Sequence, residues 1–214
     1  MKKGFFITFE GGEGAGKSTQ ISLLASYLRE KHSKEVVCTR EPGGTIGAEE
    51  IRNLLVKGGQ DRWDKLTELL LFSAARRDHL VKKILPTVQS GNIILSDRYA
   101  DSTIAYQCFG YGFNETVYRQ AELLYQLIAD DFYPNLTIIL DIDVQKGLER
   151  SKKRAGNDEQ RFEDMDLSFH QNLKDGFLFL SRKYPHRYAV IDANRSIEEI
   201  HQDIITVVRE RLGL

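Results

Sequence analysis

The sequence predicts an α/β fold with a five-stranded parallel sheet flanked by helices. Five short apolar runs are separated by segments of helix length. The runs are residues 5–9 (FFITF), 36–39 (VVCT), 92–96 (NIILS), 136–140 (LTIIL) and 188–192 (YAVID). Each run is continuous rather than alternating, which favours strands covered on both faces, as in sheets built from β-α-β units.

Length and composition favour a single domain over residues 1–214. A chain of this length with 41% hydrophobic residues can bury one good core but hardly two. A formal net charge of -1 argues against binding to nucleic acid or to an acidic membrane, because such proteins usually carry a large basic excess. No apolar stretch approaches the roughly 20 residues of a membrane span.

The amino-terminal run and the cysteines point to a cytoplasmic protein. Lysines precede the first apolar run, but the run stops at Glu10, short of the roughly 7–15 residues of a signal-peptide core. Cys38 and Cys108 lie far apart and lack the spacing of a zinc site or a disulfide framework. We expect both to be small buried thiols in a reducing compartment.

The first predicted strand leads into a phosphate-binding loop. Gly11, Gly16, Lys17 and Ser18 fit the pattern G-x-x-x-x-G-K-[ST], and a segment with helical periodicity follows. In such a P-loop the backbone N–H groups wrap phosphate oxygens, Lys17 reaches the β- and γ-phosphates of ATP, and Ser18 holds Mg²⁺. The predicted ATP site is Gly11, Gly12, Glu13, Gly14, Ala15, Gly16, Lys17, Ser18 and Thr19. A carboxylate at position 13 is unexpected, because it repels a triphosphate unless it has another partner.

Charged residues follow the second and third predicted strands. TREPGGT and SDRYADSTIAYQ begin where those strands end, and such positions project into the crevice where open α/β sheets bind ligands. The alternative is that Arg40 pairs with Glu41, and Arg98 with Asp97, as ordinary surface ion pairs. Two arginines at adjacent strand ends beside a P-loop favour a second anion that faces the ATP.

A helix is predicted over residues 66–88, with Pro86 kinking or interrupting its end. Phe72 and Arg76 are four residues apart and share one helix face. An aromatic ring and an arginine so placed can stack on a nucleobase and bond its edge. The alternative, with Phe72 in the core and Arg76 in solvent, remains open.

Two further segments carry clear local signals. Residues 150–164 are highly charged, contain Gly156 and Asn157, and lack an apolar docking face, which predicts a small mobile lid. Near the carboxyl terminus, Ser196 and Glu199 form a capping box ahead of a helix over 197–212. We interpret that helix as a packing element.

Five segments, EGGEGAGKST, TREPGGT, LLFSAARRDH, DRYADSTIAYQ and RFED, occur in the order and spacing of one family. Any one of them is shared with other P-loop kinases, but the set is specific. Nearly end to end, the chain resembles the bacterial thymidylate kinases. The resemblance implies a P-loop kinase that phosphorylates dTMP to dTDP with MgATP in the synthesis of dTTP for DNA replication. It also implies a homodimer formed through helix faces, to which the LTELLL stretch could contribute.

The resemblance assigns the acceptor site. It implies that Arg40 and Arg98 bind the monophosphate, that Phe72 stacks on thymine, and that Arg76 contacts a thymine carbonyl. Further implied dTMP-binding residues are Glu13, which accepts a hydrogen bond from the 3′-hydroxyl, Tyr106, whose ring packs where a 2′-hydroxyl would collide, and the polar Thr103 and Gln107 around the base.

The resemblance also assigns the catalytic charges. It implies that Lys17, Arg98, Glu13 and a lid arginine act in catalysis, and that Asp97 lies near the metal held by Ser18. The P-loop GGEGAGKS has no arginine, whereas the lid contains Arg150, Arg154 and Arg161. The chain therefore resembles the lid-arginine type, with Arg154 as the catalytic lid residue and Arg150 near ATP.

Rival functions are disfavoured by the same residues. A nucleoside kinase needs a base for a neutral hydroxyl and has no use for an arginine pair. A P-loop switch is disfavoured because D-R-Y replaces the D-x-x-G of a typical switch and no N-K-x-D motif occurs. An acceptor phosphate with a second pKa of about 6 is largely dianionic at neutral pH, so no histidine is needed as a base. We expect the histidines to be surface or helix residues: His32, His79, His170, His186 and His201.

Overall fold

A computed structural model describes residues 4–59, 62–153, 162 and 165–214. Its sheet has the strand order β2-β3-β1-β4-β5, and each pair of neighbours is parallel. The predicted five-stranded parallel sheet is therefore confirmed. The strands are β1 (Phe5–Glu10), β2 (Val36–Arg40), β3 (Ile93–Asp97), β4 (Leu136–Asp141) and β5 (Tyr188–Asp192).

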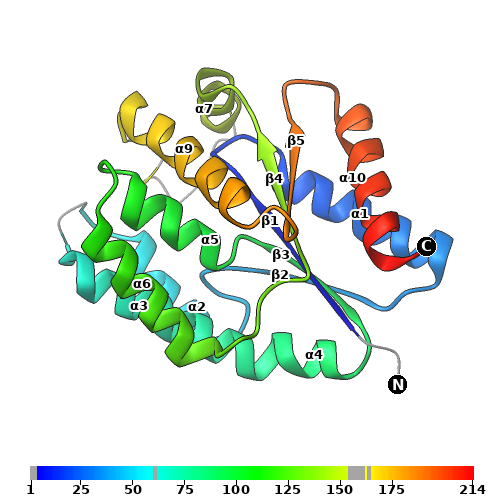
Figure 1. Cartoon of the computed structure of the whole chain (residues 1–214), viewed down its shortest axis with the longest axis horizontal. Helices are drawn as coiled ribbons and strands as arrows, with labels where there is room; N and C mark the ends of the chain where they lie inside the picture. The colour runs from blue at the N-terminus through cyan, green and yellow to red at the C-terminus, as the bar shows by residue number, and fades with distance from the viewer. Residues whose placement is uncertain (1–3, 60–61, 154–161, 163–164) are drawn as a thin grey trace.

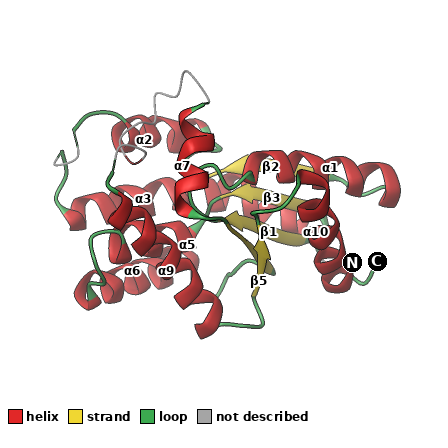
Figure 2. Ribbon diagram, turned by 90° about the horizontal axis from the view of Figure 1, so that it is seen from above, coloured by secondary structure: helices red, strands yellow, loops and turns green. Residues whose placement is uncertain are grey.

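Helices cover both faces of this sheet. Figures 1 and 2 show α1 and α10 together on one side, with α3, α5, α6 and α9 on the other. The described helices are α1 (Lys17–His32), α2 (Ile46–Val56), α3 (Lys65–His79), α4 (Leu85–Gln89), α5 (Ala100–Thr103), α6 (Glu115–Ala129), α7 (Val144–Lys152), α9 (Leu167–Lys183) and α10 (Ile197–Leu212). Two π-helical segments, η1 (Leu80–Ile84) and η2 (Ile104–Phe109), continue α3 and α5.

The predicted interruption near Pro86 is confirmed, and it begins before the proline. Helix α3 passes into the π-helical η1, and Pro86 falls in the first turn of α4. In a first turn a missing backbone N–H costs no intrahelical hydrogen bond. The change of helical pitch thus lets the chain continue in a helical path through a proline.

The carboxyl-terminal helix α10 begins as predicted. The Ser196 hydroxyl accepts from the Glu199 N–H at 3.2 Å, and the Glu199 carboxylate accepts from the Ser196 N–H at 3.0 Å. These reciprocal bonds satisfy two N–H groups that a helix start leaves open. The buried side chains of Ile200, Ile204 and Val208 then join the core that α10 shares with α1.

One expectation about burial is wrong. Cys108 is buried, but Cys38 is exposed. Cys38 lies on β2, an edge strand in which more and less exposed residues alternate after Val36. At the edge of the sheet, a continuous apolar run therefore does not show that helices cover both faces of the strand. His79 and His170 lie on helices α3 and α9, as expected, yet both are buried.

The strand register places the functional segments at one edge. Asp97, the last residue of β3, pairs with Arg40 of β2 on one side and with Phe9 of β1 on the other. The loops that follow these three strands therefore leave the sheet side by side. Within the described parts of the chain, no helix has both the length and the apolar character needed to cross a membrane.

Candidate functional site

The P-loop turns between β1 and α1 through glycines in left-handed conformations. Gly11, Gly14 and Gly16 have φ values of 131°, 68° and 93°. A Cβ at Gly14 would also lie 1.9 Å from the carbonyl oxygen of Gly147 in α7, so side chains are excluded there by contact as well as by φ. The loop delivers the N-terminus of α1, whose first N–H groups are a ready site for phosphate.

Lys17 lies at the start of α1 and is buried. Its Nζ atom donates to the carbonyl oxygens of Gly11 and Gly12, both at 3.1 Å. Burial, and then the nearby Arg98, lower the pKa of Lys17. The ammonium therefore folds back over its own loop, where a phosphate oxygen would compete with the two carbonyls for it.

The two predicted metal ligands lie next to each other. The Ser18 hydroxyl donates to Oδ2 of Asp97 at 2.8 Å, across 79 residues of sequence. Both supply hard oxygen atoms at the mouth of the P-loop, and Mg²⁺ commonly combines one or two such ligands with water and substrate phosphates. These residues fit the ion that the sequence predicts.

A cavity of about 370 Å³ extends from the P-loop to α3 and η2. It brings together most of the predicted site. The predicted residues that line it are Glu13, Gly14, Ala15, Gly16, Lys17, Ser18, Arg40, Phe72, Arg76, Asp97, Arg98, Thr103, Tyr106 and Gln107. Gly11 and Gly12 line a smaller hollow behind the P-loop.

Four further predicted residues line neither of these hollows or lie outside the described residues. Arg150, on α7, donates to the carbonyl oxygen of Ala193 at 3.5 Å, in the loop between β5 and α10. Thr19 is an exposed residue of α1. Arg154 and Arg161, and with them most of the predicted lid, lie outside the described residues.

Glu13 has a cationic partner and a hydroxyl partner, which explain how a carboxylate can lie in a phosphate-binding loop. Its Oε1 atom accepts from Nη2 of Arg98 at 2.7 Å and from the Tyr106 hydroxyl at 2.6 Å. Burial disfavours the charged carboxylate, but the cations Arg98 and Lys17 outweigh it and lower the pKa of Glu13 to about 2. Glu13 is therefore ionised at neutral pH and holds Arg98 in the cavity.

Arg98 is fixed from several directions. Its φ of 67° is left-handed, and Oγ of Ser96 donates to its carbonyl oxygen at 2.7 Å. Nη1 donates to Gly11 and to the Ser102 hydroxyl, each at 3.1 Å, and the guanidinium lies 4.9 Å from the ring centroid of Tyr106. A non-glycine residue with this φ costs free energy unless its surroundings determine it, as they do here.

Arg40 and Asp97 also depart from the simple ion-pair alternative. Arg40 bonds Glu49 at 3.0 Å, and Asp97 bonds Ser18. Glu41 instead receives bonds from Arg76 and His79 inside the protein. The side chains adjacent in sequence thus have partners from other elements.

The far end of the cavity is formed by α3 and η2. Arg76 is buried, and its Nη2 donates to the Thr103 hydroxyl at 2.9 Å. The alternative of a solvent-facing Arg76 is therefore wrong. Phe72 lines the cavity as a half-buried side chain, and Gln107 donates to Glu68 at 3.4 Å.

Sequence reasoning missed a buried carboxylate, Glu10, that supports the segment following β3. Oε1 of Glu10 accepts from the Tyr99 N–H at 2.7 Å, and Oε2 accepts from the Ser102 hydroxyl at 2.6 Å. Burial and the nearby Asp101 raise the pKa of Glu10 to about 8. The available signal is an acidic residue that ends an apolar strand immediately before the P-loop.

Gly147 was also missed. A Cβ there would lie 2.5 Å from the carbonyl oxygen of Glu13, so α7 packs directly on the P-loop. This contact positions the helix that leads into the predicted lid segment. A lone glycine in a short charged helix gave no sequence signal for it.

Fold and site together define a P-loop kinase, in which a phosphate-binding loop and helix N-terminus face a second pocket rich in arginine. The model of the Thymidylate kinase family matches residues 9–204. The chain belongs to the thymidylate kinase family.

Individual relatives agree with that assignment. The chain is 46% identical to a thymidylate kinase from Ruegeria pomeroyi, over 98% of this chain and 97% of the relative. It is also 46% identical to one from Caulobacter vibrioides, over the full length of both. A crystal structure of thymidylate kinase from Ehrlichia chaffeensis is similar with a TM-score of 0.77 and 38% identity, covering 96% of this chain and 99% of that one.

Proposed function

We propose that the protein transfers the γ-phosphoryl group of MgATP to dTMP, giving dTDP and ADP, in the synthesis of dTTP for DNA replication. The observation that carries the proposal is one continuous cavity with the P-loop at one end and Phe72 and Arg76 at the other. Arg98 bonds Gly11 and Glu13 of the P-loop, so an acceptor phosphate bound to it would face the donor. The names of the relatives support the choice of substrate.

The donor is bound by the P-loop. We assign the phosphates of ATP to the backbone N–H groups of the loop and of the first turn of α1, with Lys17 moving from the carbonyls of Gly11 and Gly12 to the β- and γ-phosphates. Ser18 and Asp97 would hold Mg²⁺. When bound, the ion neutralises phosphate charge and orients the γ-phosphoryl group.

The acceptor is bound as a dianion, so the protein needs no general base. Arg98, fixed by Glu13 and Ser102, presents its charge to the acceptor phosphate, and Arg40 approaches from the end of β2. The protein's task is then to hold two phosphates in line and to offset the charge on the migrating group.

Sugar and base would occupy the remainder of the cavity. Among the described residues, both bonds to Glu13 are at Oε1, so we assign the 3′-hydroxyl of dTMP to Oε2. We assign to the ring of Tyr106, which lines the cavity, the restriction of a 2′-hydroxyl. We assign the base to the lining side chains of Phe72, Arg76, Thr103 and Gln107, as the resemblance to the family implies.

We also infer that arginines of the lid supply charge to the transition state, with Arg154 as the catalytic residue and Arg150 beside the nucleotide. The P-loop itself contains no arginine that could do so. Arg150 already lies on α7, the helix that packs against the P-loop through Gly147.

We further propose that the 214 residues act as one domain and form a homodimer through α3 and α6. Leucine side chains of both helices are exposed: Leu66 (43%) and Leu70 (48%) on α3, and Leu123 (71%) and Leu127 (80%) on α6. Burying apolar area of this kind favours association. Sedimentation should give a dimer for the wild type and a monomer for Leu123→Glu/Leu127→Glu.

The proposed reaction is tested by measuring ATP consumption with a panel of nucleoside monophosphates. We expect dTMP to be the preferred acceptor and Lys17→Ala to abolish most turnover in a folded protein. Equal rates for purine and pyrimidine monophosphates would contradict the assignment. We place the reaction in the cytoplasm, where the thiols of Cys38 and Cys108 would remain reduced, and cell fractionation checks that location.

A further inference from the structure

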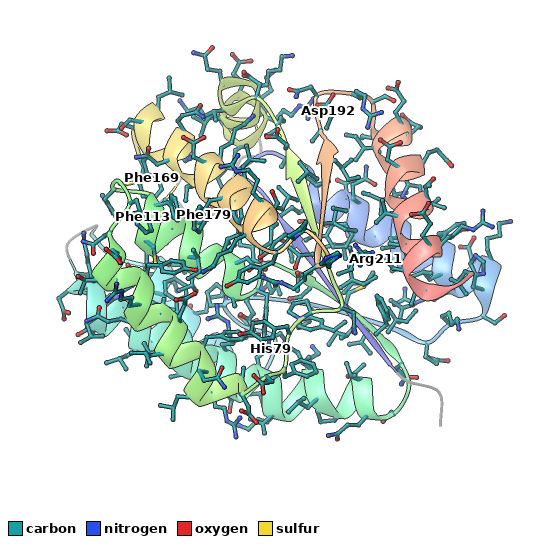
Figure 3. The ribbon with its side chains drawn as sticks, in the orientation of Figure 1. His79, Phe113, Phe169, Phe179, Asp192 and Arg211 are labelled. Atoms are coloured by element: carbon teal, nitrogen blue, oxygen red, sulfur yellow. The ribbon has the colours of Figure 1, made fainter. Side chains whose placement is uncertain are left out.

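His79 is a fully buried residue at the end of α3, at 0% exposure. Figure 3 shows it among the crowded side chains of the interior. Its Nε2 atom lies 2.7 Å from the Thr39 hydroxyl on β2. The turn after β2 encloses the ring, because a Cβ at Gly44 would lie 2.6 Å from Nε2 of His79. The imidazole is therefore held in one orientation.

The other ring nitrogen of His79 contacts a buried carboxylate. Nδ1 lies 2.9 Å from Oε1 of Glu41, which is 4% exposed. The second oxygen of Glu41, Oε2, accepts from Nε of Arg76 at 2.8 Å. One carboxylate thus joins an imidazole and a guanidinium of the same helix, and each of its oxygens bonds one of the two.

Arg76 has most of its donors assigned by the protein. Nε bonds Glu41, while Nη2 bonds the Thr103 hydroxyl at 2.9 Å and the Tyr99 carbonyl at 3.3 Å. Burial would lower the pKa of Arg76, but the charge of Glu41 reverses that and raises the pKa. A charged donor group is therefore held in a fixed orientation, with Nη1 as the nitrogen that carries no bond to the described residues.

We propose that His79 and Glu41 are positioning residues that fix the guanidinium of Arg76 and so set which base the acceptor pocket takes. This inference rests on the proposed function. The order of action is Thr39 to His79, His79 to Glu41, and Glu41 to Arg76. Glu41 is a lining residue of the cavity, but Thr39 and His79 are not, so His79 can act on the substrate only through Glu41 and Arg76.

The chemistry of the guanidinium explains the selectivity. Arginine only donates hydrogen bonds, so a fixed guanidinium favours a pyrimidine that presents a carbonyl and disfavours one that presents an amino group at the same place. An arginine free to turn away tolerates both. Thymine and cytosine differ in this way at ring position 4, so the ratio of kcat/KM for dTMP to that for dCMP measures how firmly Arg76 is held.

Two substitutions of His79 separate its contacts. The side-chain amide nitrogen of Asn reaches about as far as Nδ1 of histidine, so His79→Asn keeps a donor for Glu41. The amide nitrogen of Gln reaches about as far as Nε2, so His79→Gln keeps the contact with Thr39 and removes the bond to Glu41. We expect His79→Gln to lower the dTMP-to-dCMP ratio about tenfold, the loss of roughly one bond to a charged group. His79→Asn should stay near the wild-type ratio.

A purely structural role would not produce this pattern. It predicts a lower Tm in both variants, with the substrate ratio and the KM for ATP unchanged. An unchanged ratio in His79→Gln, or equal losses in the two variants, overturns the proposal. If His79→Gln fails to fold, Glu41→Gln neutralises the carboxylate that joins His79 to Arg76 and must lower the ratio instead.

Hydrogen exchange of the Arg76 Nε–H, followed by NMR without any substrate, distinguishes this inference from the proposed function. Exchange should be slow in the wild type and in His79→Asn, and faster in His79→Gln. If the wild type phosphorylates dTMP but exchange and ratio are unaffected, only the positioning role fails. If the wild type does not act on dTMP, the proposed function fails, and the exchange rates still decide whether His79 holds Arg76.

Discussion

Arg40 ends β2 and Arg98 follows the neighbouring β3, and both are assigned to the same phosphate, but the protein holds them differently. The Arg98 side chain is 16% exposed and bonds Glu13 and Ser102 from a left-handed backbone position. The Arg40 side chain is 53% exposed and pairs with Glu49, itself 38% exposed. One arginine is built into the site, while the other reaches it from the surface.

The difference separates two kinds of contribution to catalysis. A charge fixed before the substrate arrives needs no reorganisation during the reaction, so it acts mainly on the transition state. A mobile surface charge must leave a partner and lose side-chain entropy, so its net gain is small and appears mainly in binding. Arg98 should therefore determine kcat, and Arg40 should determine the KM for dTMP.

The largest effect should come from Arg98→Ala. Losing a preorganised charge should cost about 3 kcal/mol in the transition state, a decrease in kcat on the order of 100-fold. Steady-state kinetics with a Tm measurement test this, and Arg98→Lys is the matched variant that keeps charge without the forked geometry. An unchanged kcat, or a fall in Tm large enough to unfold the protein, would contradict the claim that Arg98 differs from Arg40 by acting on the transition state.

The next effect concerns the pH dependence of stability. The pKa of Glu13 is about 2 in the folded protein against an ordinary value of 4.5, so its contribution is present above about pH 4.5 and is lost as the pH falls toward 2. Between pH 6 and pH 3 the wild type should lose on the order of 2 kcal/mol more unfolding free energy than Glu13→Gln. Urea titrations at both pH values measure this difference.

Glu49→Gln is the matched control for that experiment, because Glu49 holds the exposed arginine. Hydrogen bonds from Arg40 and Gly44 overcome a burial cost and lower the pKa of Glu49, but the pair is open to solvent. Its pH-dependent difference should be clearly smaller than that of Glu13→Gln. Equal differences would mean that the two ion pairs are equally strong and that exposure does not distinguish them.

A smaller effect is expected from Arg40→Ala. The KM for dTMP should rise about fivefold, equivalent to roughly 1 kcal/mol, while kcat changes little. Glu49→Gln sharpens the test because it releases Arg40 from its partner, and the KM for dTMP should then be equal to or below that of the wild type. A loss of kcat like that of Arg98→Ala would show that Arg40 is also part of the preorganised site.

The smallest effect should come from Tyr106→Phe. This change removes the hydroxyl that donates to Glu13 at 2.6 Å but leaves the ring over Arg98. Tyr106 is a neutral donor, and Glu13 keeps its ion pair with Arg98 when the hydroxyl is lost. The loss should therefore cost about 1 kcal/mol or less in kcat/KM. Tyr106→Ala is the contrasting variant, and it should narrow the preference for dTMP over its ribonucleotide, since the ring no longer restricts a 2′-hydroxyl.

Much of the fold follows from local sequence. Continuous apolar runs predicted all five strands, and the G-x-x-x-x-G-K-[ST] spacing placed the P-loop between β1 and α1. The capping box at Ser196 and the interruption at Pro86 were also predicted. These features depend on residues a few positions apart, whose conformational preferences are written in the sequence itself.

The membership of the site was partly predictable for a related reason. Parallel strands of similar length end at one edge, so the residues that end or follow β1, β2 and β3 must lie near one another. That rule brings Arg40, Asp97 and Arg98 to the P-loop without any knowledge of their contacts. The rule does not predict exposure. Cys38 was expected to be buried but is exposed, because β2 lies at the edge of the sheet and the run VVCT does not reveal the order of the strands.

By itself, then, the sequence determined where the elements begin and which side chains can reach the phosphate edge. Only the tertiary structure decided the partners. Arg98 pairs with Glu13 and not with the adjacent Asp97. Glu41 pairs with Arg76 and His79 and not with the adjacent Arg40. The physical reason is that an ion pair depends on burial and on the approach of two chain segments, and neither is determined by adjacency in the sequence.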